Sequence, residues 1–253
     1  MKVSILVPAF NEEKTIERVL LKLLALPIRE LEIIVVDDGS TDATGRIVQQ
    51  LAGDNPGIRC FAQPKNLGKT AAISRAISES TGEVLIVQDA DLEYDPNEIP
   101  EIISPIIEGV ADVVYGSRFL VKRASRVLYY YHYLANKFLT CLSNILTNRN
   151  MSDIETCYKA FHREVIRPLK LCSRGFGMEV EITAMVCKTK ARTYEVPISY
   201  YGRTYEEGKK IGTRDGLAAI WYILYFNLIH AYTKSGRNYI ETVNSSLEDR
   251  HSR

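Results

Sequence analysis

The chain has 253 residues, of which 32 are Lys or Arg and 31 are Asp or Glu, so its formal net charge is only +1. This balance argues against the strong basic field of a nucleic-acid-binding protein. Five widely spaced cysteines without a Cys-x-x-Cys pair indicate reduced thiols, and the first residues lack the pattern of a signal peptide, so we expect a cytoplasmic protein.

The first half of the chain alternates short β-branched apolar runs with amphipathic helical patterns. The apolar runs cover residues 2–7, 33–36, 59–62, 83–88 and 112–115, and the helical patterns between them include residues 16–24 and 68–80. This order predicts right-handed βαβ units, and so an α/β fold with a mostly parallel central sheet and helices on both faces.

The second half of the chain is less regular. It contains helical patterns at 127–147, 179–188 and 215–233 and a strand pattern at 192–196. We expect a single domain over residues 1–235, which ends in the apolar helix near 215–233. The polar residues 243–253 are predicted to form a disordered tail.

Three carboxylates, Asp89, Asp91 and Glu93, directly follow the apolar run 83–88. In an extended backbone alternate side chains point to one side, so these three are expected to converge. Oxygen ligands without His or Cys suit Mg²⁺ or Mn²⁺. The competing explanation is a solvated acidic turn, because isolated Asp-x-Asp sequences are common in loops.

Polar residues also follow the first two predicted strands, at 8–12 and 37–40. The parallel topology brings these segments and residues 89–91 to the same edge of the sheet, where ligands of such sheets bind. A nucleotide and metal site is therefore expected there. A P-loop is disfavoured because Gln63 stands where that motif requires Gly, and no Gly-x-Gly-x-x-Gly follows the first strand.

Five short segments of the chain carry a resemblance to a known family. Residues 7–12, 36–42, 66–69, 89–91 and 116–118 together resemble glycosyltransferase family 2. The resemblance implies a GT-A fold, with the nucleotide-sugar site at the strand carboxyl ends, and inverting transfer of a hexose from a nucleotide-diphosphate sugar. The motif spacing and the segment 203–209 are most similar to dolichol-phosphate mannosyltransferases and bacterial polyprenyl-phosphate hexosyltransferases.

The resemblance also assigns roles to individual residues. For the nucleotide sugar it implies Pro8, Phe10, Glu12, Asp37, Lys69, Asp89 and Ala90. For Mg²⁺ or Mn²⁺ it implies Asp89, Asp91 and Glu93, and for catalysis at the diphosphate Asp91, Arg118, Arg203 and Lys209. Arg118 and Arg126 are expected to hold the acceptor phosphate. Phe10 replaces the usual Tyr, Glu93 the usual Gln, and Thr70 a frequent Gly, so the base and the metal preference stay open.

The acceptor is inferred from the lack of an evident catalytic base outside the predicted tail. A hydroxyl nucleophile needs a base, and the Glu-Asp pair that relatives use for it occurs only at 248–249, in the predicted tail. A phosphate monoester has a second pKa of about 6 and needs none, which favours a polyprenyl phosphate such as dolichyl or undecaprenyl phosphate. Two alternatives stay open. One is transfer to a soluble saccharide or protein hydroxyl with Asp153, Glu155, Glu179 or Glu181 as base, and the other is a non-catalytic nucleotide-sugar-binding scaffold.

Two apolar helical patterns bear on membrane contact. Residues 216–233 contain no formally charged side chain but do contain Trp and several Tyr, which suits a helix lying at a membrane interface. The pattern 127–147 is also rich in Tyr and follows three basic residues. We expect a protein that binds peripherally to the cytoplasmic face of a membrane. The competing uses of these helices are packing on the sheet and a homodimer contact.

Overall fold

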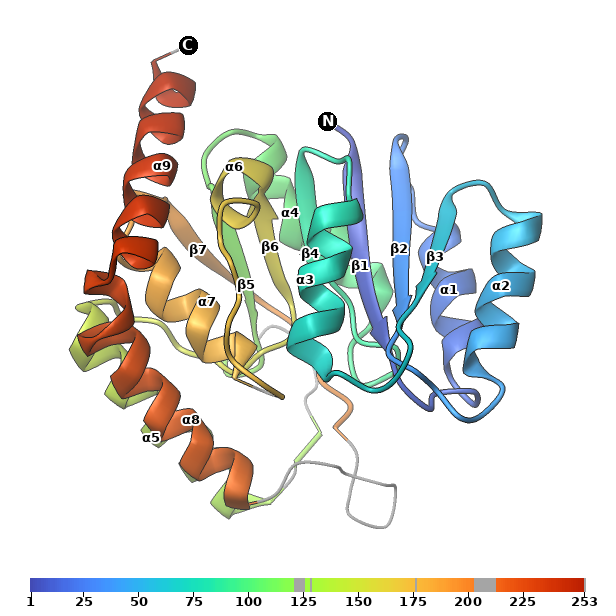
Figure 1. Ribbon diagram of the computed structural model, residues 1–253, viewed down its shortest axis with the longest axis horizontal. Coiled ribbons are helices and arrows are strands. Elements are labelled where there is room, and N and C mark those ends of the chain that lie inside the picture. Colours follow the sequence, from blue (N-terminus) through green and yellow to red (C-terminus); the bar gives the residue numbers. More distant parts are fainter. Residues whose placement is uncertain (121–125, 128, 176, 203–212, 253) are drawn as a thin grey trace.

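The computed structural model describes residues 1–120, 126–127, 129–175, 177–202 and 213–252 (Figure 1). Their central feature is a seven-stranded sheet with the strand order β3-β2-β1-β4-β6-β5-β7. The strands are β1 Val3–Ala9, β2 Leu31–Asp37, β3 Ile58–Ala62, β4 Val84–Val87, β5 Val113–Ser117, β6 Lys159–His162 and β7 Thr193–Pro197. Neighbouring strands are parallel except at β6, which is antiparallel to both β4 and β5.

Helices cover both faces of the sheet. In Figure 1, α3 and α7 lie in front of it, whereas α1 and α4 lie behind it. The helices are α1 Ile16–Leu24, α2 Thr44–Asp54, α3 Lys69–Glu79, α4 Ile99–Ile107, α5 Tyr130–Thr147, α6 Arg163–Ile166, α7 Met178–Val186, α8 Thr213–Leu228 and α9 Lys234–His251. Short 3₁₀ turns, Pro96–Glu98 and His230–Tyr232, precede α4 and α9. The predicted α/β fold with a mostly parallel sheet is confirmed.

The sheet core positions the strand ends at which polar residues were predicted. β4 is buried throughout, and β1 and β2 are nearly so, because helices pack on both faces. The α1 side chains Ile16, Val19, Leu20 and Leu23 supply one apolar face toward this core. The pairing of Ala9 with Asp37 brings the carboxyl ends of β1 and β2 level at the lower edge of the view in Figure 1.

Strand β6 was not predicted from the sequence. It has only four residues, and its apolar pattern is broken by Lys159 at one end and His162 at the other, both of which are nevertheless buried. Its partners lie 70 or more residues earlier in β4 and nearly 50 earlier in β5, a pairing that no local sequence signal reports. The strand seats the Lys159 side chain inside the protein.

The prediction of a disordered tail at 243–253 is wrong. Helix α9 continues through it to His251, because Tyr239, Val243 and Leu247 repeat every four residues and are all buried. The predicted apolar helix 215–233 is divided between α8 and the 3₁₀ turn before α9. In the described part of the chain, no helix combines the length and the apolar character required to span a membrane.

The far end of α9 is fixed to the sheet by the buried carboxylate of Asp112. Its Oδ1 accepts hydrogen bonds from Arg250 Nη1 at 2.9 Å and lies 3.1 Å from His251 Nε2. Arg192 donates to the same carboxylate through Nε and Nη2, both at 3.1 Å. Burial raises the pKa of Asp112, but the hydrogen bonds from Arg192 and His251 outweigh it and hold the pKa below its ordinary value.

Replacing Asp112 with Asn should loosen α9. We expect a loss of about 2 kcal/mol in the free energy of unfolding, since hydrogen bonds to charged groups contribute about 1.5–3 kcal/mol each. The loss is limited because the Arg192 guanidinium can form hydrogen bonds to water instead. The loss should be full at neutral pH and shrink under acid, where the lowered pKa of Asp112 is crossed in the wild type. Urea titration measures the loss. The exposed pair Lys190–Glu248 provides a control, because Glu248→Gln should leave stability at the wild-type value.

Candidate functional site

The loops that follow β1 and β2 are joined by hydrogen bonds. Asn11 has a φ of 52°, and its Oδ1 accepts a hydrogen bond from the Thr41 backbone N–H at 2.8 Å. The backbone N–H of Asn11 donates to Ser40 Oγ at 3.0 Å. The Glu12 amide donates to Thr44 Oγ1 at 2.8 Å. The segment that carries Pro8, Phe10 and Glu12 therefore lies against the segment that begins at Asp37.

Two adjacent aspartates at the end of β2 have different partners. Asp37 Oδ1 accepts from the Ser40 amide at 2.9 Å. Asp38 accepts from Gln63 Nε2 and from the Leu67 and Gly68 amides, each at 2.8 Å. Asp38 therefore holds the loop that leads into α3, a structural role that the sequence interpretation missed. The sequence signal for this contact was that the segments 36–42 and 66–69 both belong to the family motifs.

The third strand end is joined to the first by Thr15. Its hydroxyl lies 3.0 Å from the carbonyl oxygen of Ala90 and 3.1 Å from Glu12 Oε2. From the other side, Lys69 Nζ lies 2.9 Å from Asp89 Oδ1 and 3.0 Å from Glu179 Oε1. The predicted gathering of three strand ends at one sheet edge is thus what the structure shows, with Lys69 in a partly buried ion-pair bridge.

The extended backbone predicted for residues 89–93 is wrong. β4 ends at Val87 and the chain bends from Ala90 to Tyr94, so the three carboxylates do not line up. Asp89 pairs with Lys69, whereas Glu93 Oε2 accepts from the Tyr200 hydroxyl at 2.8 Å and Asp91 Oδ1 from the Glu93 amide at 3.1 Å. Across the described residues, no three His, Cys, Asp or Glu side chains form a ready-made metal cluster.

Arg118 lies in a largely buried ion pair. Its Nε and Nη2 donate to the two oxygens of Asp153 at 2.7 and 2.8 Å, and its guanidinium lies over the Tyr200 ring at 5.2 Å. Burial lowers the pKa of Arg118, but Asp153 outweighs this and raises it well above the ordinary value. The Arg126 guanidinium donates to the Gly202 carbonyl at 2.9 Å. Arg203 and Lys209, both predicted to act at the diphosphate, lie outside the described residues.

Glu155 and Glu179 form a second acidic pair, and Glu179 shares Lys69 with Asp89. Glu155 Oε1 and Glu179 Oε2 are buried oxygens that have no hydrogen-bond partner in the described structure. Burial, and next the charge of Glu179, raise the pKa of Glu155 to about 7. In contrast, Glu181 accepts from the Cys172 and Ser173 amides, both at 2.8 Å. Of the four bases considered from the sequence, Asp153 and Glu181 are therefore already engaged in strong structural contacts.

The raised pKa of Glu155 predicts a pH-dependent stability. A carboxyl whose pKa is higher in the fold than in the unfolded chain favours folding when protonated, so this contribution is full below pH 4.5 and is lost as pH rises through about 7. Glu155→Gln should therefore raise the free energy of unfolding at about pH 8 by roughly 3 kcal/mol, and by almost nothing at about pH 4.5. Urea titrations at both pH values test this. The exposed Glu17→Gln variant should match the wild type at each, and an equal gain for Glu155→Gln at both would contradict the assignment.

The sequence profile of glycosyl transferase family 2 matches residues 4–169, well over half of the chain. The chain belongs to this family. The family assignment agrees with the resemblance seen in the motifs, and the matched region contains the three strand ends together with Lys69, Arg118 and Asp153. Glu179 and residues 203–209 lie beyond it.

Two curated relatives of the chain have names that refer to dolichol phosphate and undecaprenyl phosphate. The chain is 30% identical over 215 residues to a dolichol-phosphate mannosyltransferase of Pyrococcus furiosus, with 84% of this chain and 60% of that protein covered. It is 29% identical over 213 residues to an undecaprenyl-phosphate 4-deoxy-4-formamido-L-arabinose transferase of Proteus mirabilis, with coverages of 82% and 62%. The chain thus spans about 60% of the length of these relatives.

Solved structures support the fold of this family 2 member. A glucosyl-3-phosphoglycerate synthase of Mycobacterium tuberculosis, crystallised with phosphoglyceric acid, superposes with a TM-score of 0.68 at 20% identity, covering 89% of this chain and 80% of that one. The same enzyme crystallised with Mg²⁺ and uridine diphosphate gives a TM-score of 0.68 at 21% identity, with 89% and 79% covered. At this identity the likeness shows a shared fold.

Proposed function

We propose that this family 2 glycosyltransferase moves a hexose, with inversion, from a nucleotide-diphosphate sugar to a polyprenyl phosphate. The observation that carries the proposal is the convergence of the three strand ends around Lys69 and Asp89. The acceptor class is supported by the names of both curated relatives, one a dolichol-phosphate and the other an undecaprenyl-phosphate sugar transferase. Solved structures of the similar enzyme with UDP and with UDP-glucose support the donor class.

The donor is assigned to the interlocked loops. Pro8, Phe10, Glu12 and Asp37 would hold the base and ribose, because their segments lie together at the sheet edge. Lys69, Asp89 and Ala90 would lie under the diphosphate and sugar. GDP-mannose and UDP-glucose are the two donor types to be distinguished.

A divalent cation fits this donor site only together with the donor. Mg²⁺ is usually held by one or two carboxylates plus substrate phosphates, so the absence of a three-carboxylate cluster among the described residues does not conflict with it. Asp91, with Asp89 and Glu93 nearby in the chain, would hold Mg²⁺ or Mn²⁺ against the diphosphate. The bound ion would neutralise the charge that develops on the leaving diphosphate.

The acceptor phosphate is assigned to the Arg118 side of the site. Arg118, Arg126, Arg203 and Lys209 would supply cations to the acceptor and the leaving group. The Asp153 carboxylate holds the Arg118 guanidinium in one orientation through two hydrogen bonds, so little side-chain entropy is lost when it binds a phosphate. A phosphate dianion attacks the anomeric carbon without a general base.

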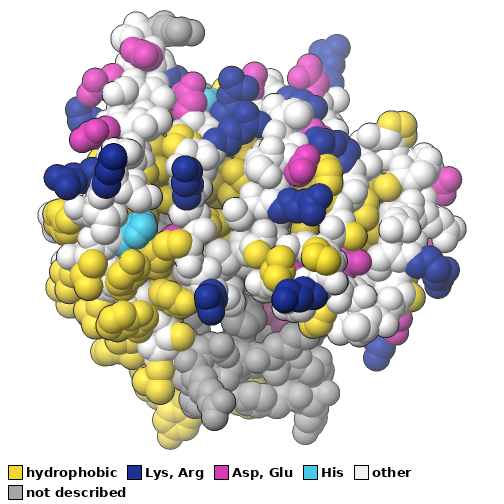
Figure 2. Space-filling view, viewed as in Figure 1, with side chains coloured by type: hydrophobic (Ala, Val, Ile, Leu, Met, Phe, Trp, Pro, Cys, Tyr) yellow, Lys and Arg dark blue, Asp and Glu magenta, His cyan; other side chains and the backbone are white. Residues whose placement is uncertain are grey.

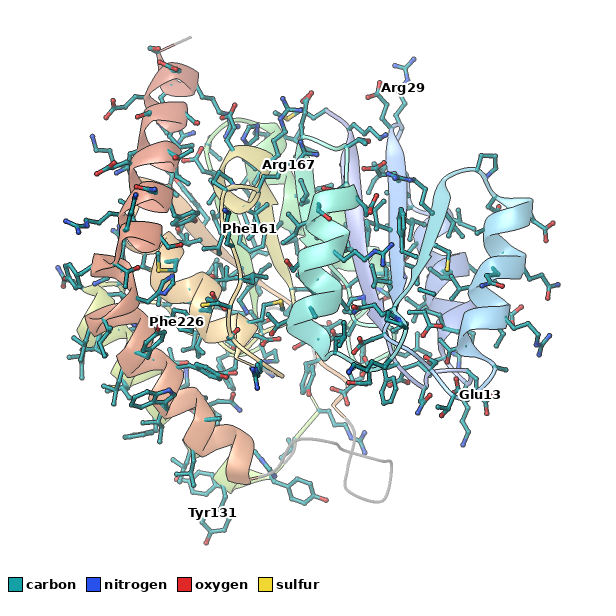
Figure 3. The ribbon with its side chains drawn as sticks, in the orientation of Figure 1. Glu13, Arg29, Tyr131, Phe161, Arg167 and Phe226 are labelled. Atoms are coloured by element: carbon teal, nitrogen blue, oxygen red, sulfur yellow. The ribbon has the colours of Figure 1, made fainter. Side chains whose placement is uncertain are left out.

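Helices α5 and α8 would place this acceptor at a membrane surface. Large apolar side chains gather over these two helices at the lower left of Figure 2. Tyr131 is 83% exposed and points away from the body of the protein in Figure 3, and Trp221 on α8 is 60% exposed. Exposed aromatic and aliphatic side chains of this kind suit the interfacial region of a bilayer. We therefore propose peripheral binding at the cytoplasmic face. A homodimer contact is the competing use of this surface.

The test measures sugar transfer by the full chain from UDP-glucose and GDP-mannose, with Mn²⁺, to a long-chain polyprenyl phosphate in vesicles. Radiolabel should enter the lipid phase, and the chain should float with the vesicles. Transfer only to soluble sugar or protein would instead support a hydroxyl acceptor with Glu155, whose pKa of about 7 suits a base. Donor binding without any turnover would support the non-catalytic scaffold.

A further inference from the structure

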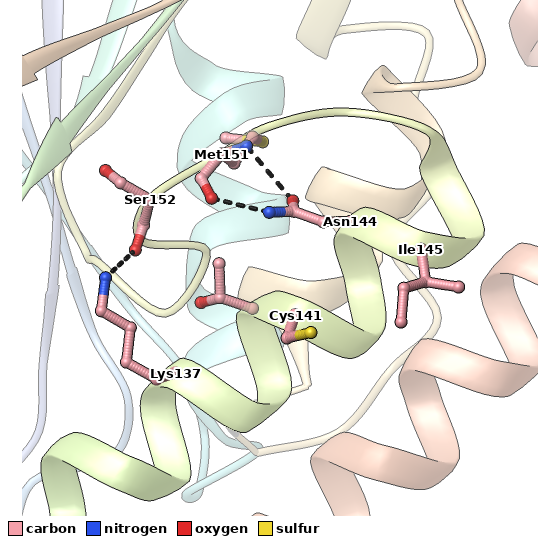
Figure 4. Close-up of a pocket in the computed structure, with 7 residues that line it drawn as sticks. Lys137, Cys141, Asn144, Ile145, Met151 and Ser152 are labelled. Carbon is pink, nitrogen blue, oxygen red and sulfur yellow. Dashed lines mark hydrogen bonds between the residues drawn. The ribbon is translucent and has the colours of Figure 1, made fainter.

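A hollow of about 410 Å³ lies beside α5, between that helix and the residues that follow it (Figure 4). This volume lies within the range of roughly 300–1,000 Å³ that is common for small-molecule sites. Its lining is amphipathic and comprises Lys137, Thr140, Cys141, Asn144, Ile145, Met151 and Ser152. None of these residues has a role in the donor site described above.

One end of the hollow carries an isolated cation. Lys137 is the only Lys, Arg, Asp or Glu in α5, and its ammonium lies 3.3 Å from the Ser152 carbonyl oxygen. In the described part of the structure, no carboxylate forms an ion pair with it. The ammonium lies against the ring of Phe119, 4.4 Å from the centroid, and the Arg118 guanidinium lies against the same ring at 5.7 Å. Two cations therefore lie within about 6 Å of the centre of one aromatic ring.

The other end of the hollow is apolar and opens onto exposed hydrophobic surface. Cys141 and Ile145 lie one turn apart on α5, and Ile145 is 72% exposed. Phe138, on the adjoining surface of the same helix, is 57% exposed. Met151 closes the far wall, where Asn144 exchanges hydrogen bonds with the Met151 backbone at 2.8 and 3.2 Å. A hydrocarbon chain that leaves the hollow would continue along α5.

The cationic end of the hollow adjoins the acceptor side of the site. Ser152 lines the hollow, and its hydroxyl lies 2.6 Å from that of Ser117. The next residue after each serine, Asp153 and Arg118, forms the bidentate ion pair described above. A ligand with its phosphate near Arg118 can thus extend a hydrocarbon chain past Lys137 into the hollow.

We propose that this hollow binds the first isoprene units of the lipid acceptor, with the phosphate between Arg118 and Lys137 and the chain against Cys141, Ile145 and Met151. The inference rests on the proposed polyprenyl-phosphate acceptor. An anionic head at the one cation of α5, with an apolar tail toward its exposed apolar surface, matches the order of groups along the hollow. Chain length beyond the phosphate then becomes a determinant of affinity.

Thiol protection tests occupancy without relying on catalysis. Cys141 lines the hollow and is exposed, so a maleimide should modify it in detergent micelles. A long-chain polyprenyl phosphate added to the micelles should slow this modification at least fivefold, whereas inorganic phosphate and a neutral polyprenol should not. An added thiol at Gln50→Cys, on the exposed face of α2, is the reference and should react at an unchanged rate, because Glu181 holds the Cys172 thiol protonated. Equal Cys141 rates with and without the lipid phosphate would overturn the proposal.

Variants separate this inference from the proposed function. Cys141→Trp fills the hollow and should raise the KM for a long-chain acceptor at least tenfold, with little change for methyl phosphate, which has no isoprene unit to enter the hollow. Ile145→Asp, at an exposed position that tolerates charge, should act in the same direction if the Trp variant folds poorly. Gln50→Trp, on the exposed face of α2, is the matched control and should change neither KM. Equal effects of Cys141→Trp on both acceptors would refute the chain-binding hollow while leaving polyprenyl-phosphate transfer intact, whereas transfer to neither acceptor would count against the function itself.

Discussion

Replacing Lys69 with Met should lower the free energy of unfolding by about 2–3 kcal/mol, less than the roughly 3–5 kcal/mol lost when one partner is removed from a fully buried ion pair. Lys69 joins Asp89 to Glu179, and Glu179 is almost completely buried. Without the ammonium, the carboxylates of Asp89 and Glu179 lose the cation that they share. Burial lowers the pKa of Lys69, but the charges of Asp89 and Glu179 outweigh it, so in the wild type the lysine stays charged across the whole range of stability measurements.

Urea denaturation with linear extrapolation measures this loss. Lys65→Met provides the matched control, because Lys65 lies four residues earlier with an exposed side chain, and we expect a change within about 0.5 kcal/mol. Adding Asp89→Asn to Lys69→Met should recover part of the loss, since one of the two uncompensated charges disappears. Losses that simply add in the double variant would show that the two side chains do not interact, and the ion-pair bridge would have to be abandoned.

The sheet and its strand ends were predictable because their signals are local. Buried parallel strands give short β-branched runs, and helices give apolar side chains every three or four residues, as at Ile16, Val19, Leu20 and Leu23. The order of these elements fixes a parallel sheet whose carboxyl ends share one edge. The sequence alone therefore predicts that residues 8–12, 37–40 and 89–91 lie together.

The parts that could not be predicted depend on contacts between distant segments. β6 is antiparallel and pairs with strands far away in the sequence. The C-terminal residues look like a polar tail, but Asp112 binds Arg250 and His251 from 138 and 139 positions away. Local alternation likewise suggested converging carboxylates at 89–93, whereas Lys69 and Tyr200 each engage one of them. Tertiary partners override local patterns in all three cases.

Replacing Asp91 with Asn should reduce the rate of sugar transfer at least a hundredfold, the scale seen when one group that stabilises developing charge is removed from an active site. Asn retains the side-chain oxygen that accepts from the Glu93 amide, so the loop geometry should persist. What Asn lacks is the negative charge that would hold Mg²⁺ or Mn²⁺ against the donor diphosphate. Donor affinity should therefore also stop depending on the divalent cation.

The measurement pairs transfer kinetics with donor binding, each with Mn²⁺ and with a chelator. Asp95→Asn is the matched control. It alters a carboxylate in the same loop that accepts from Lys22 and from the Asn97 side chain, and it should keep both activity and metal dependence near the wild-type values. If Asp91→Asn instead kept full, chelator-sensitive transfer, the cation would have to bind through other groups, since charge at Asp91 is the one feature the substitution removes. Loss of transfer with unchanged, still metal-dependent donor binding would place Asp91 at the chemical step and leave the cation to Asp89 and Glu93.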